Sequence, residues 1–348
     1  MAQATLKDRE IRHHVARASR LKDPGASREA ALKAWETMRT NRRVRAVKGS
    51  ATLLEFLGES LLLPPGVESA KYKLNPPLIK KSKLTYAEKG GVGKELSDGW
   101  VINIAVGCTF GCRFCYVDEI HKKFSFQRVG SVVYRDWGYY FALPENLEQV
   151  MDQTDWSKWK GQEVMMSSTH DPYLPQLYKF SRKILQRALP AGVKFCIQSR
   201  SPLVEKDFDL LYEYKKQVRI QVSVATLEEK LSRLIEPRVV PPLRRMETLR
   251  RAKDYGLTTG IIIAPVFPSV KARPDVKSDL SEIAMMLGDI RPDHIYGESV
   301  HVRGINLAYL EKALEEKVEL GGFDRKAEKM FHDSLGEQGL SGRWWPEH

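Results

Sequence analysis

The chain has 348 residues, a formal net charge of +12 and four cysteines. A chain of this length buries a sizeable core and usually forms one large or two small domains. It has no apolar run near the roughly 18 residues that span a bilayer, no apolar signal peptide at its start and too few cysteines for a secreted disulfide scaffold, so we expect a cytoplasmic protein without a membrane anchor.

The first 50 residues carry most of the excess positive charge. They contain 13 Lys and Arg against 5 Asp and Glu, a net charge of about +8, which leaves about +4 for the rest of the chain. This asymmetry favours an anionic partner such as nucleic acid, although a solvated basic surface has the same composition. Prolines and glycines over residues 64–96 predict loop structure. We therefore expect a basic N-terminal extension over residues 1–96, helical at first and then loop-rich.

From residue 97 onward, short apolar runs alternate with amphipathic segments. The predicted strands lie near residues 101–106, 163–168, 194–198, 219–224, 259–264 and 294–299. The clearest helical periodicity covers residues 175–189, 227–235 and 242–255. Alternating strands and helices predict a parallel sheet with right-handed crossovers. We expect an α/β core over residues 97–306, a partial (β/α)6 barrel, followed by a C-terminal helix and tail over residues 307–348.

Three of the four cysteines stand together after the first predicted strand. Cys108, Cys112 and Cys115 form a C-x3-C-x2-C pattern. A cubane iron–sulfur cluster usually takes four thiolates. Three thiolates in one loop leave the fourth iron free to bind a substrate or cofactor. The spacing therefore predicts a [4Fe–4S] cluster that takes part in the reaction and is not only an electron carrier.

Two other interpretations of the cysteines are possible. A structural zinc site needs four protein ligands, and His121 or His170 could complete one, but no second Cys or His pair supports it. A disulfide between residues so close in sequence would be strained. The fourth cysteine, Cys196, lies in an apolar run that predicts a strand, where a free cysteine is most often simply buried.

The cysteine segment, with Phe114 and Tyr116 beside it, resembles that of the radical S-adenosylmethionine (SAM) superfamily. Further similar blocks cover residues 167–173, 198–202, 222–226, 235–237 and 261–268. In this order they look like the spore photoproduct lyase-like group, also described as DNA repair photolyase-like. In parallel β/α barrels, reactive groups gather at the C-terminal ends of the strands. These blocks occur where predicted strands end, so the two arguments indicate the same region.

The resemblance implies an enzyme that holds the [4Fe–4S] cluster on the three loop cysteines and binds SAM at the open iron. An electron from the reduced cluster then breaks the sulfonium C–S bond, and the resulting 5′-deoxyadenosyl radical takes a hydrogen atom from the substrate. A reductant such as flavodoxin or ferredoxin would supply the electron. The protein itself must bind and orient the cofactor and exclude water.

The polar residues at the strand ends are suited to SAM. The SAM-binding candidates are Tyr116, Ser167, Ser168, Thr169, Arg200 and Ser223. Arg200 stands where the group commonly has a lysine, and its planar fork matches carboxylate oxygens. Ser223 matches a serine near the SAM ribose. Asp171 either pairs with the SAM ammonium or caps the helix that follows it.

The chain departs from spore photoproduct lyase at one position that matters for the reaction. The lyase has a cysteine near the end of its second strand as a hydrogen donor, whereas residues 165–169 here contain none. Cys196 and Tyr173 are the remaining candidates for a donor. We therefore expect a different specific reaction from that of the lyase.

Several charged residues near the later strands allow a structural or a functional role. We expect Glu236 to form a salt bridge with Arg244 or Arg245. Glu298 ends the sixth predicted strand, and His301 and Arg303 follow it. The three form either a substrate contact or a satisfied polar network.

We expect a radical SAM enzyme that acts on nucleic acid through its basic N-terminal region. The alternative is a radical SAM enzyme that modifies a peptide, a protein or a small metabolite. A third hypothesis, different in class, is a non-catalytic nucleic-acid-binding module stabilised by an iron–sulfur cluster or zinc. The sequence does not identify the atom that is attacked.

Overall fold

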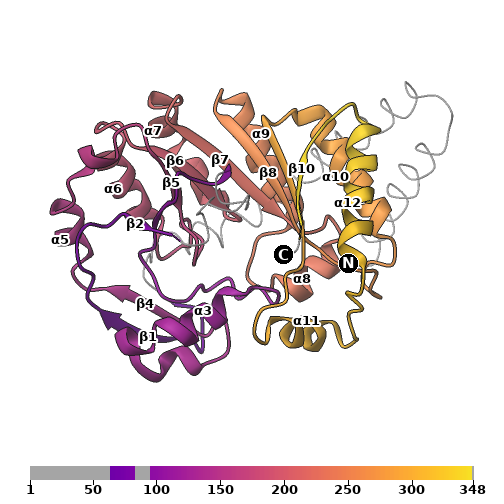
Figure 1. The fold of residues 1–348 in the computed structure, drawn as a ribbon, viewed down its shortest axis with the longest axis horizontal. Helices are drawn as coiled ribbons and strands as arrows, with labels where there is room; N and C mark the ends of the chain where they lie inside the picture. Colours follow the sequence, from indigo (N-terminus) through magenta and orange to yellow (C-terminus); the bar gives the residue numbers. More distant parts are fainter. Residues whose placement is uncertain (1–62, 83–94, 347–348) are drawn as a thin grey trace. The chain divides into compact units, whose positions relative to one another are not determined.

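The computed structural model describes residues 63–82 and 95–346, and Figure 1 shows their arrangement. The strongly basic segment of the expected N-terminal extension lies outside these described residues. No helix in the described part of the chain combines the length and apolar character that a bilayer crossing requires.

The elements follow one another along the chain as the alternation of patterns predicts. The strands are β1 (Glu68–Tyr72), β2 (Lys80–Lys81), β3 (Trp100–Ile102), β4 (Tyr140–Pro144), β5 (Glu163–Met166), β6 (Lys194–Ser199), β7 (Val218–Val224), β8 (Thr258–Val266), β9 (His294–Ser299) and β10 (Arg343–Trp345). The α-helices are α3 (Val117–Phe124), α4 (Phe126–Val129), α5 (Leu147–Asp152), α6 (Tyr178–Ala188), α7 (Phe208–Glu213), α8 (Glu229–Ile235), α9 (Pro242–Asp254), α10 (Val276–Ile290), α11 (Asn306–Leu314) and α12 (Phe323–Gly336). Short 3-10 helices are η2 (Gly130–Tyr134), η3 (Trp156–Trp159) and η4 (Pro202–Asp207).

The large sheet has the strand order β10-β9-β8-β7-β6-β5-β3-β2. The six predicted strands correspond to β3, β5, β6, β7, β8 and β9, and each pairs in parallel with the next in sequence order. Helices connect these strands, as parallel pairing requires. The ends of the sheet do not meet, so the partial (β/α)6 barrel expected from the sequence is confirmed.

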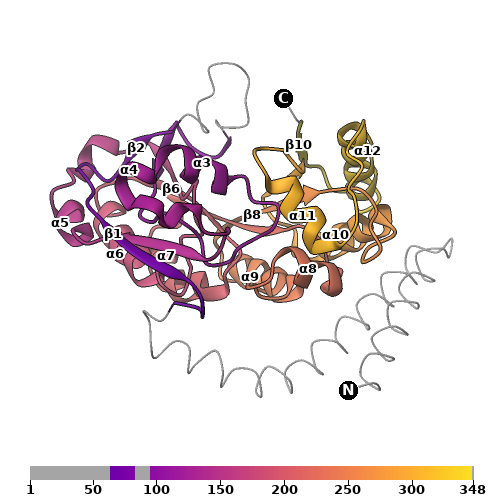
Figure 2. The same cartoon turned by 90° about the horizontal axis from the view of Figure 1, so that it is seen from below.

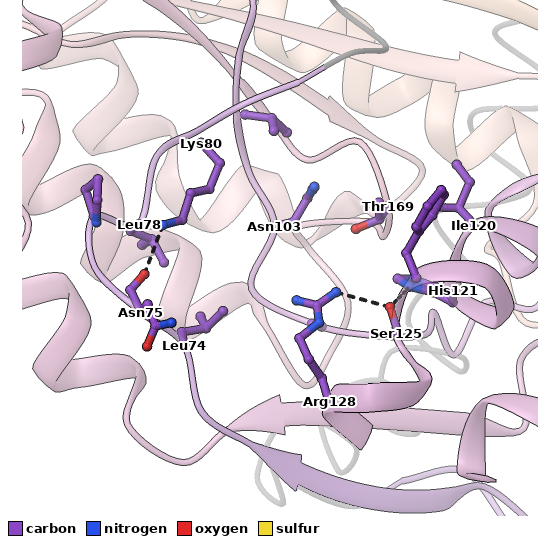
Figure 3. Close-up of a pocket in the computed structure, with 14 residues that line it drawn as sticks. Leu74, Asn75, Leu78, Lys80, Asn103, Ile120, His121, Ser125, Arg128 and Thr169 are labelled. Atoms are coloured by element: carbon purple, nitrogen blue, oxygen red, sulfur yellow. Dashed lines mark hydrogen bonds between the residues drawn. The ribbon is translucent and has the colours of Figure 1, made fainter. Parts of the chain in front are cut away.

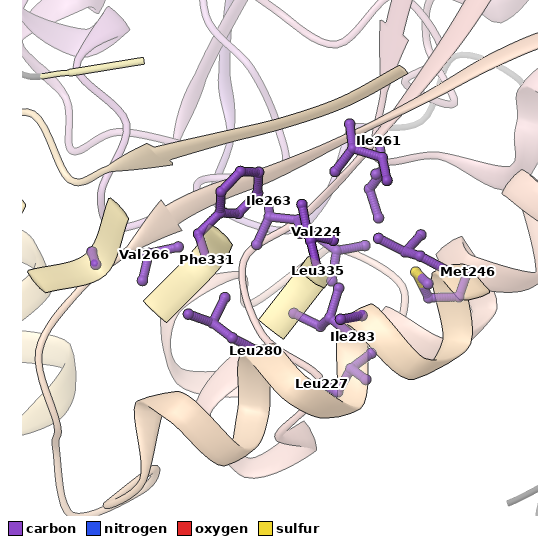
Figure 4. Packing of buried hydrophobic residues seen from close by; sticks show 14 of the residues in the cluster. Val224, Leu227, Met246, Ile261, Ile263, Val266, Leu280, Ile283, Phe331 and Leu335 are labelled. Atoms are coloured by element: carbon purple, nitrogen blue, oxygen red, sulfur yellow. The ribbon is translucent and has the colours of Figure 1, made fainter. Parts of the chain in front are cut away.

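One face of this sheet packs against helices. Figure 2 shows α6, α7, α9 and α8 in a row along it. In the β7–β8 region, Val224, Ile261 and Ile263 are buried against Met246 of α9 and Ile283 of α10 (Figure 4). Alternation along each strand directs these side chains to the same side. Each such burial is worth about 1.5–3 kcal/mol, which makes this face the main core.

The opposite, concave face carries more polar side chains. Gln198 of β6 donates a hydrogen bond to Gln221 of β7 (3.1 Å). Nearer the start of the strands, Arg219 pairs with Glu163 (2.7 Å). Buried polar groups are costly unless they are paired. These pairs therefore allow the concave face to bury polar side chains between its strands.

Three features of the fold were not predicted. A small parallel sheet of β1 and β4 accompanies the barrel, β2 pairs antiparallel with β3, and β10 adds a parallel strand beside β9. In β10, Trp345 stacks on Tyr296 with ring centroids 4.7 Å apart, and Trp344 contacts Phe331. A Cβ on Gly297 would lie 2.6 Å from Trp344, so only glycine lets this strand approach.

Candidate functional site

The three cysteines lie in a buried loop between β3 and α3. The loop begins at Gly107, whose φ of +90° favours glycine. A Cβ there would lie 2.3 Å from the Tyr140 carbonyl oxygen of β4. Glycine thus allows the loop to turn directly against the small sheet, and the following residues place Cys108 and Cys112 in the interior.

Distant segments hold the loop in position. The Arg113 amide donates to the last carbonyl of α8 (2.8 Å). Arg238 donates to the Thr109 carbonyl (3.0 Å), and Asn306 donates to the Phe114 carbonyl (2.9 Å). These bonds satisfy backbone groups that no helix or strand satisfies. The cysteine backbone is therefore fixed by residues more than 100 positions further along the chain.

The pKa values of the three thiols bear on whether the loop can bind a metal group. Burial raises the pKa of Cys108 and Cys115 to about 12 and that of Cys112 further still, and the charge of one thiolate raises the pKa of another. These mutual effects place each thiol within electrostatic reach of another. Buried thiols of this kind become thiolates when a metal replaces their protons. The loop therefore fits a cationic metal group.

Arg200 supplies positive charge beside the loop. Its guanidinium lies over the Phe114 ring, 5.5 Å from the centroid, and its charge lowers the pKa of Cys112 and Cys115. Its Nε donates to Glu236 (2.9 Å) and an Nη donates to the Ala264 carbonyl (3.3 Å). Arg200 therefore lies where it offsets negative charge on the thiolates.

The geometry does not favour a single metal ion. Across residues 63–82 and 95–346, no three His, Cys, Asp or Glu side chains converge closely enough to hold one ion. His170 accepts a hydrogen bond from the Ile104 amide at Nε2 (3.0 Å), and burial lowers its pKa to about 4. Each cysteine of a cubane binds a different iron, so a cluster does not need such tight convergence.

The serines after β5 are held by a residue that the sequence analysis missed. Asn103 accepts hydrogen bonds from Ser167 Oγ (2.8 Å) and the Ser168 amide (3.0 Å), and its own amide donates to Ser168 Oγ (3.1 Å). Asn103 follows β3, where a polar residue between apolar neighbours was the available signal. The two predicted serines therefore lie at the end of β5, and Asn103 ties them to the end of β3, from which the cysteine loop begins.

Asp171 has a structural role in this network. Its carboxylate accepts hydrogen bonds from the amides of Tyr173 (2.8 Å) and Arg200 (2.6 Å) and from Ser199 Oγ (2.8 Å). The turn after β5 is thereby tied to the end of β6. Ser223 is buried near the end of β7, and its carbonyl accepts from Arg245 (2.7 Å).

The predicted trio after β9 comes together around Tyr116. His301 Nδ1 lies 3.2 Å from a Glu298 carboxylate oxygen, and the Arg303 guanidinium lies 5.4 Å from the centroid of the Tyr116 ring. Burial raises the pKa of Glu298 to about 7. A carboxyl with this pKa exchanges a proton near neutral pH, which suits contact with a substrate.

Cys196 faces the concave side but lies low in the barrel. It stands in register with Met165 of β5 and Arg219 of β7, near the start of the strands. Cys196 lies four positions before Arg200, a distance of about 13 Å along a strand. It is fully buried, and burial raises the pKa of its thiol to about 12. The structure thus places Cys196 well below the cysteine loop.

The Tyr173 hydroxyl is engaged in a buried hydrogen bond. It donates to Asp207 (2.8 Å) in η4, and Arg182 of α6 pairs with the same carboxylate (2.8 Å). The side chain is fully buried. The expectation of a hydrogen donor at Tyr173 overlooked this partner, because a sequence does not show what a hydroxyl contacts.

We expect Tyr173→Phe to reduce stability without affecting chemistry. The substitution leaves Asp207 with one fewer donor, which costs about 1–3 kcal/mol. Urea unfolding measures this loss, and product formation per folded chain stays at the level of the unaltered protein. A large fall in turnover at unchanged stability would restore Tyr173 as a donor.

The sequence model of the family described as "Radical SAM superfamily" matches residues 102–315. This match covers the cysteine loop, the barrel strands from β5 to β9 and the polar residues at their ends. The chain belongs to the radical SAM superfamily. Members of this superfamily are enzymes that use a [4Fe–4S] cluster and SAM, and this chain accordingly has radical SAM activity.

Other proteins share much of this radical SAM chain. Uncharacterized protein ORF301 of Acidianus two-tailed virus is 58% identical over 282 residues, which cover 81% of this chain and 94% of the viral protein. Uncharacterized protein MJ0683 of Methanocaldococcus jannaschii is 25% identical over 64% of this chain and 78% of its own length.

Solved structures share the radical SAM fold. Spore photoproduct lyase complexed with dinucleoside spore photoproduct matches with a TM-score of 0.57 and 14% identity, over 81% of this chain and 86% of the lyase chain. A mutant of spore photoproduct lyase also gives a TM-score of 0.57, with 11% identity over 83% and 88% of the two chains. The resemblance expected from the motifs is thus confirmed for the fold.

Proposed function

We propose that this radical SAM enzyme acts on nucleic acid. The observation that carries the proposal is the net charge of about +8 in the first 50 residues, because a concentration of Lys and Arg binds phosphates. The fold adds support, since the spore photoproduct lyase that shares it was solved with a dinucleoside bound.

In this proposal, Cys108, Cys112 and Cys115 hold the cluster, and Arg200 offsets its negative charge. When bound, the cluster and SAM supply reductive C–S bond cleavage and hydrogen abstraction, with electrons from a flavodoxin or ferredoxin. The buried loop excludes water from the thiolates.

The polar groups around the loop orient SAM. Ser168 Oγ accepts a hydrogen bond from the Asn103 side-chain amide, which leaves a lone pair for the ammonium group. Ser167 Oγ donates to Asn103 and accepts from the amides of Thr169 and His170, so it holds the turn that presents these groups. Ser223 and Tyr116 supply further SAM contacts in the proposal, whereas Thr169 lies on the wall of a neighbouring pocket. Each of these groups sits on the end of a barrel strand or beside the loop, so their positions are set by the sheet.

The specific reaction differs from that of spore photoproduct lyase. The turn directly after β5, residues 167–173, contains no cysteine, and the Tyr173 hydroxyl is bonded to Asp207. Cys196 remains a candidate hydrogen donor, although its depth in the barrel requires the substrate radical to reach far into the interior. A reaction that needs no protein hydrogen donor is the simpler expectation.

The decisive experiment measures 5′-deoxyadenosine. We expect the anaerobically reconstituted chain, with dithionite and SAM, to form it at least about tenfold faster with an oligonucleotide, because substrate binding completes the site. Deuterium moves from a deuterated oligonucleotide into 5′-deoxyadenosine. Stimulation by a peptide or metabolite, and none by oligonucleotide, would contradict the proposed substrate class.

A further inference from the structure

A pocket of about 270 Å³ lies at the β2–β3 end of the barrel (Figure 3). Its walls come from the segment before β2, the inner side of β3, helix α3 and the start of α4. Asn103 and Thr169 form one side, and Asn103 also holds the serines described above. The pocket therefore adjoins the site proposed for SAM.

Two cations reach this pocket from different elements. Lys80 extends from β2 and Arg128 from α4, and Figure 3 shows both side chains directed into the same space. Lys80 Nζ donates to the Asn75 carbonyl (3.1 Å), and Arg128 donates to Ser125 Oγ (3.1 Å). Among the described residues, no Asp or Glu lines the pocket or forms a salt bridge with either cation.

The remaining polar lining can donate hydrogen bonds without adding negative charge. The side-chain amides of Asn75 and Asn103 are part of it. Thr169 Oγ1 is buried, and within the described part of the chain it has no hydrogen-bond partner. Burial lowers the pKa of His121 to about 3, so this residue is neutral and the pocket's positive charge comes from Lys80 and Arg128.

A buried hydroxyl without a partner indicates that a ligand belongs there, because an unmade hydrogen bond costs about 1–3 kcal/mol. A group with several acceptor oxygens and negative charge would satisfy the hydroxyl, the amides and both cations together. Phosphate has this chemistry, and an arginine fork is well matched to its oxygens. The volume equals that of about nine water molecules, which leaves room for part of an attached sugar.

We propose that this pocket binds a phosphate ester of the substrate. The inference deepens the proposed function, since it gives the nucleic-acid substrate a fixed point next to the SAM serines. A phosphate held there by Lys80 and Arg128 would position an attached nucleoside at the ends of β3 and β5. The basic N-terminal region would then add affinity for the nucleic acid, while the pocket would determine which nucleoside lies at the reaction site.

Neighbouring lysines on β2 provide a matched test. Lys80 lines the pocket, whereas Lys81 lies over the Trp100 ring, 5.9 Å from its centroid, and does not. We expect Lys80→Gln and Arg128→Gln each to weaken binding of deoxycytidine 5′-monophosphate by about tenfold. Lys81→Gln removes the same charge from the next residue and changes binding less than about twofold. Calorimetry on the reconstituted full chain measures these affinities.

Two further probes separate the sources of the phosphate. Deoxycytidine without phosphate binds equally to all variants if the pocket recognises phosphate. If a short oligodeoxynucleotide competes with the monophosphate, and competes less well in Lys80→Gln, the pocket binds a phosphate of nucleic acid. If the monophosphate binds and the oligodeoxynucleotide does not compete with it, the pocket binds a free nucleotide. Equal losses in Lys80→Gln and Lys81→Gln, or equal binding of nucleoside and nucleotide, would overturn the phosphate site. Because binding is measured without SAM cleavage, this failure would leave the 5′-deoxyadenosine result standing.

Discussion

Alanine in place of Cys108, Cys112 or Cys115 abolishes both iron binding and SAM cleavage. We expect the iron content of each single variant to fall from about four per chain to below about one, because two thiolates do not retain a cubane. The visible absorption of the cluster disappears in parallel. Formation of 5′-deoxyadenosine then falls to the level of a reaction without protein.

The fourth cysteine gives the matched control for this experiment. Cys196 is more deeply buried than the three loop cysteines, and it stands in register with Met165 and Arg219 near the start of the strands. Cys196→Ala therefore keeps its iron and still cleaves SAM. Should a loop variant retain four irons and full cleavage, the ligand assignment is wrong, whatever the effect on the substrate reaction.

Separating SAM cleavage from substrate turnover also tests Cys196 itself. A hydrogen donor acts after the substrate radical has formed. Its loss would leave 5′-deoxyadenosine formation intact and change only the final product. If Cys196→Ala gives the same product in the same yield, the thiol has only a packing role, as its depth in the barrel suggests.

The barrel was predictable because its signal is local. Each strand is a short apolar run, each helix repeats its apolar residues every three to four positions, and parallel pairing follows from their alternation. The small sheet of β1 and β4 gave no such signal. Its strands are 72 residues apart in register, for example Glu68 opposite Tyr140, and pairing over that distance leaves no mark on either segment.

The candidate site was predictable only where a motif defines it. The cysteines and the strand-end serines were found from spacing and position. Asn103, Lys80 and Arg128 were missed, because their meaning depends on neighbours from other elements. The partner of the Tyr173 hydroxyl, Asp207, is 34 residues away and could not be predicted either.

The ion-pair partner of Glu236 also depends on the fold, and the sequence allowed either Arg244 or Arg245. The structure selects Arg245, while Arg244 pairs instead with Glu205. Helix α9 turns consecutive residues to different sides, so the first arginine faces outward and the second faces the interior. Arg200 joins the buried pair from β6, which connects the core of the barrel to the cysteine loop.

Glu236→Gln is expected to cause the largest loss of stability. The carboxylate accepts hydrogen bonds from Arg200 (2.9 Å), from Ser232 (3.2 Å) and from two nitrogens of Arg245, one of them at 3.1 Å. Both Glu236 and Arg245 are about 1% exposed. Removing the negative charge leaves Arg245 buried without a counter-charge, which costs about 3–5 kcal/mol.

We expect the difference in stability between the unaltered protein and Glu236→Gln to become smaller at acidic pH. Burial alone would raise the pKa of Glu236, but Arg245 and Arg200 hold it below the ordinary value. A carboxyl with a lowered folded pKa stabilises the fold above its unfolded pKa, and this contribution is lost as the pH falls through the folded value. We therefore expect the gap between the two proteins to be largest near neutral pH and to shrink below about pH 4.

Glu205 provides the comparison that isolates burial. It also accepts from two arginines, but the side chains of Arg244 and Arg251 are 33% and 54% exposed. Water screens these partners, so Glu205→Gln costs only about 1 kcal/mol. Urea unfolding at neutral pH measures both variants. Equal losses would mean that the number of ion pairs, rather than their desolvation, sets the stability of this barrel.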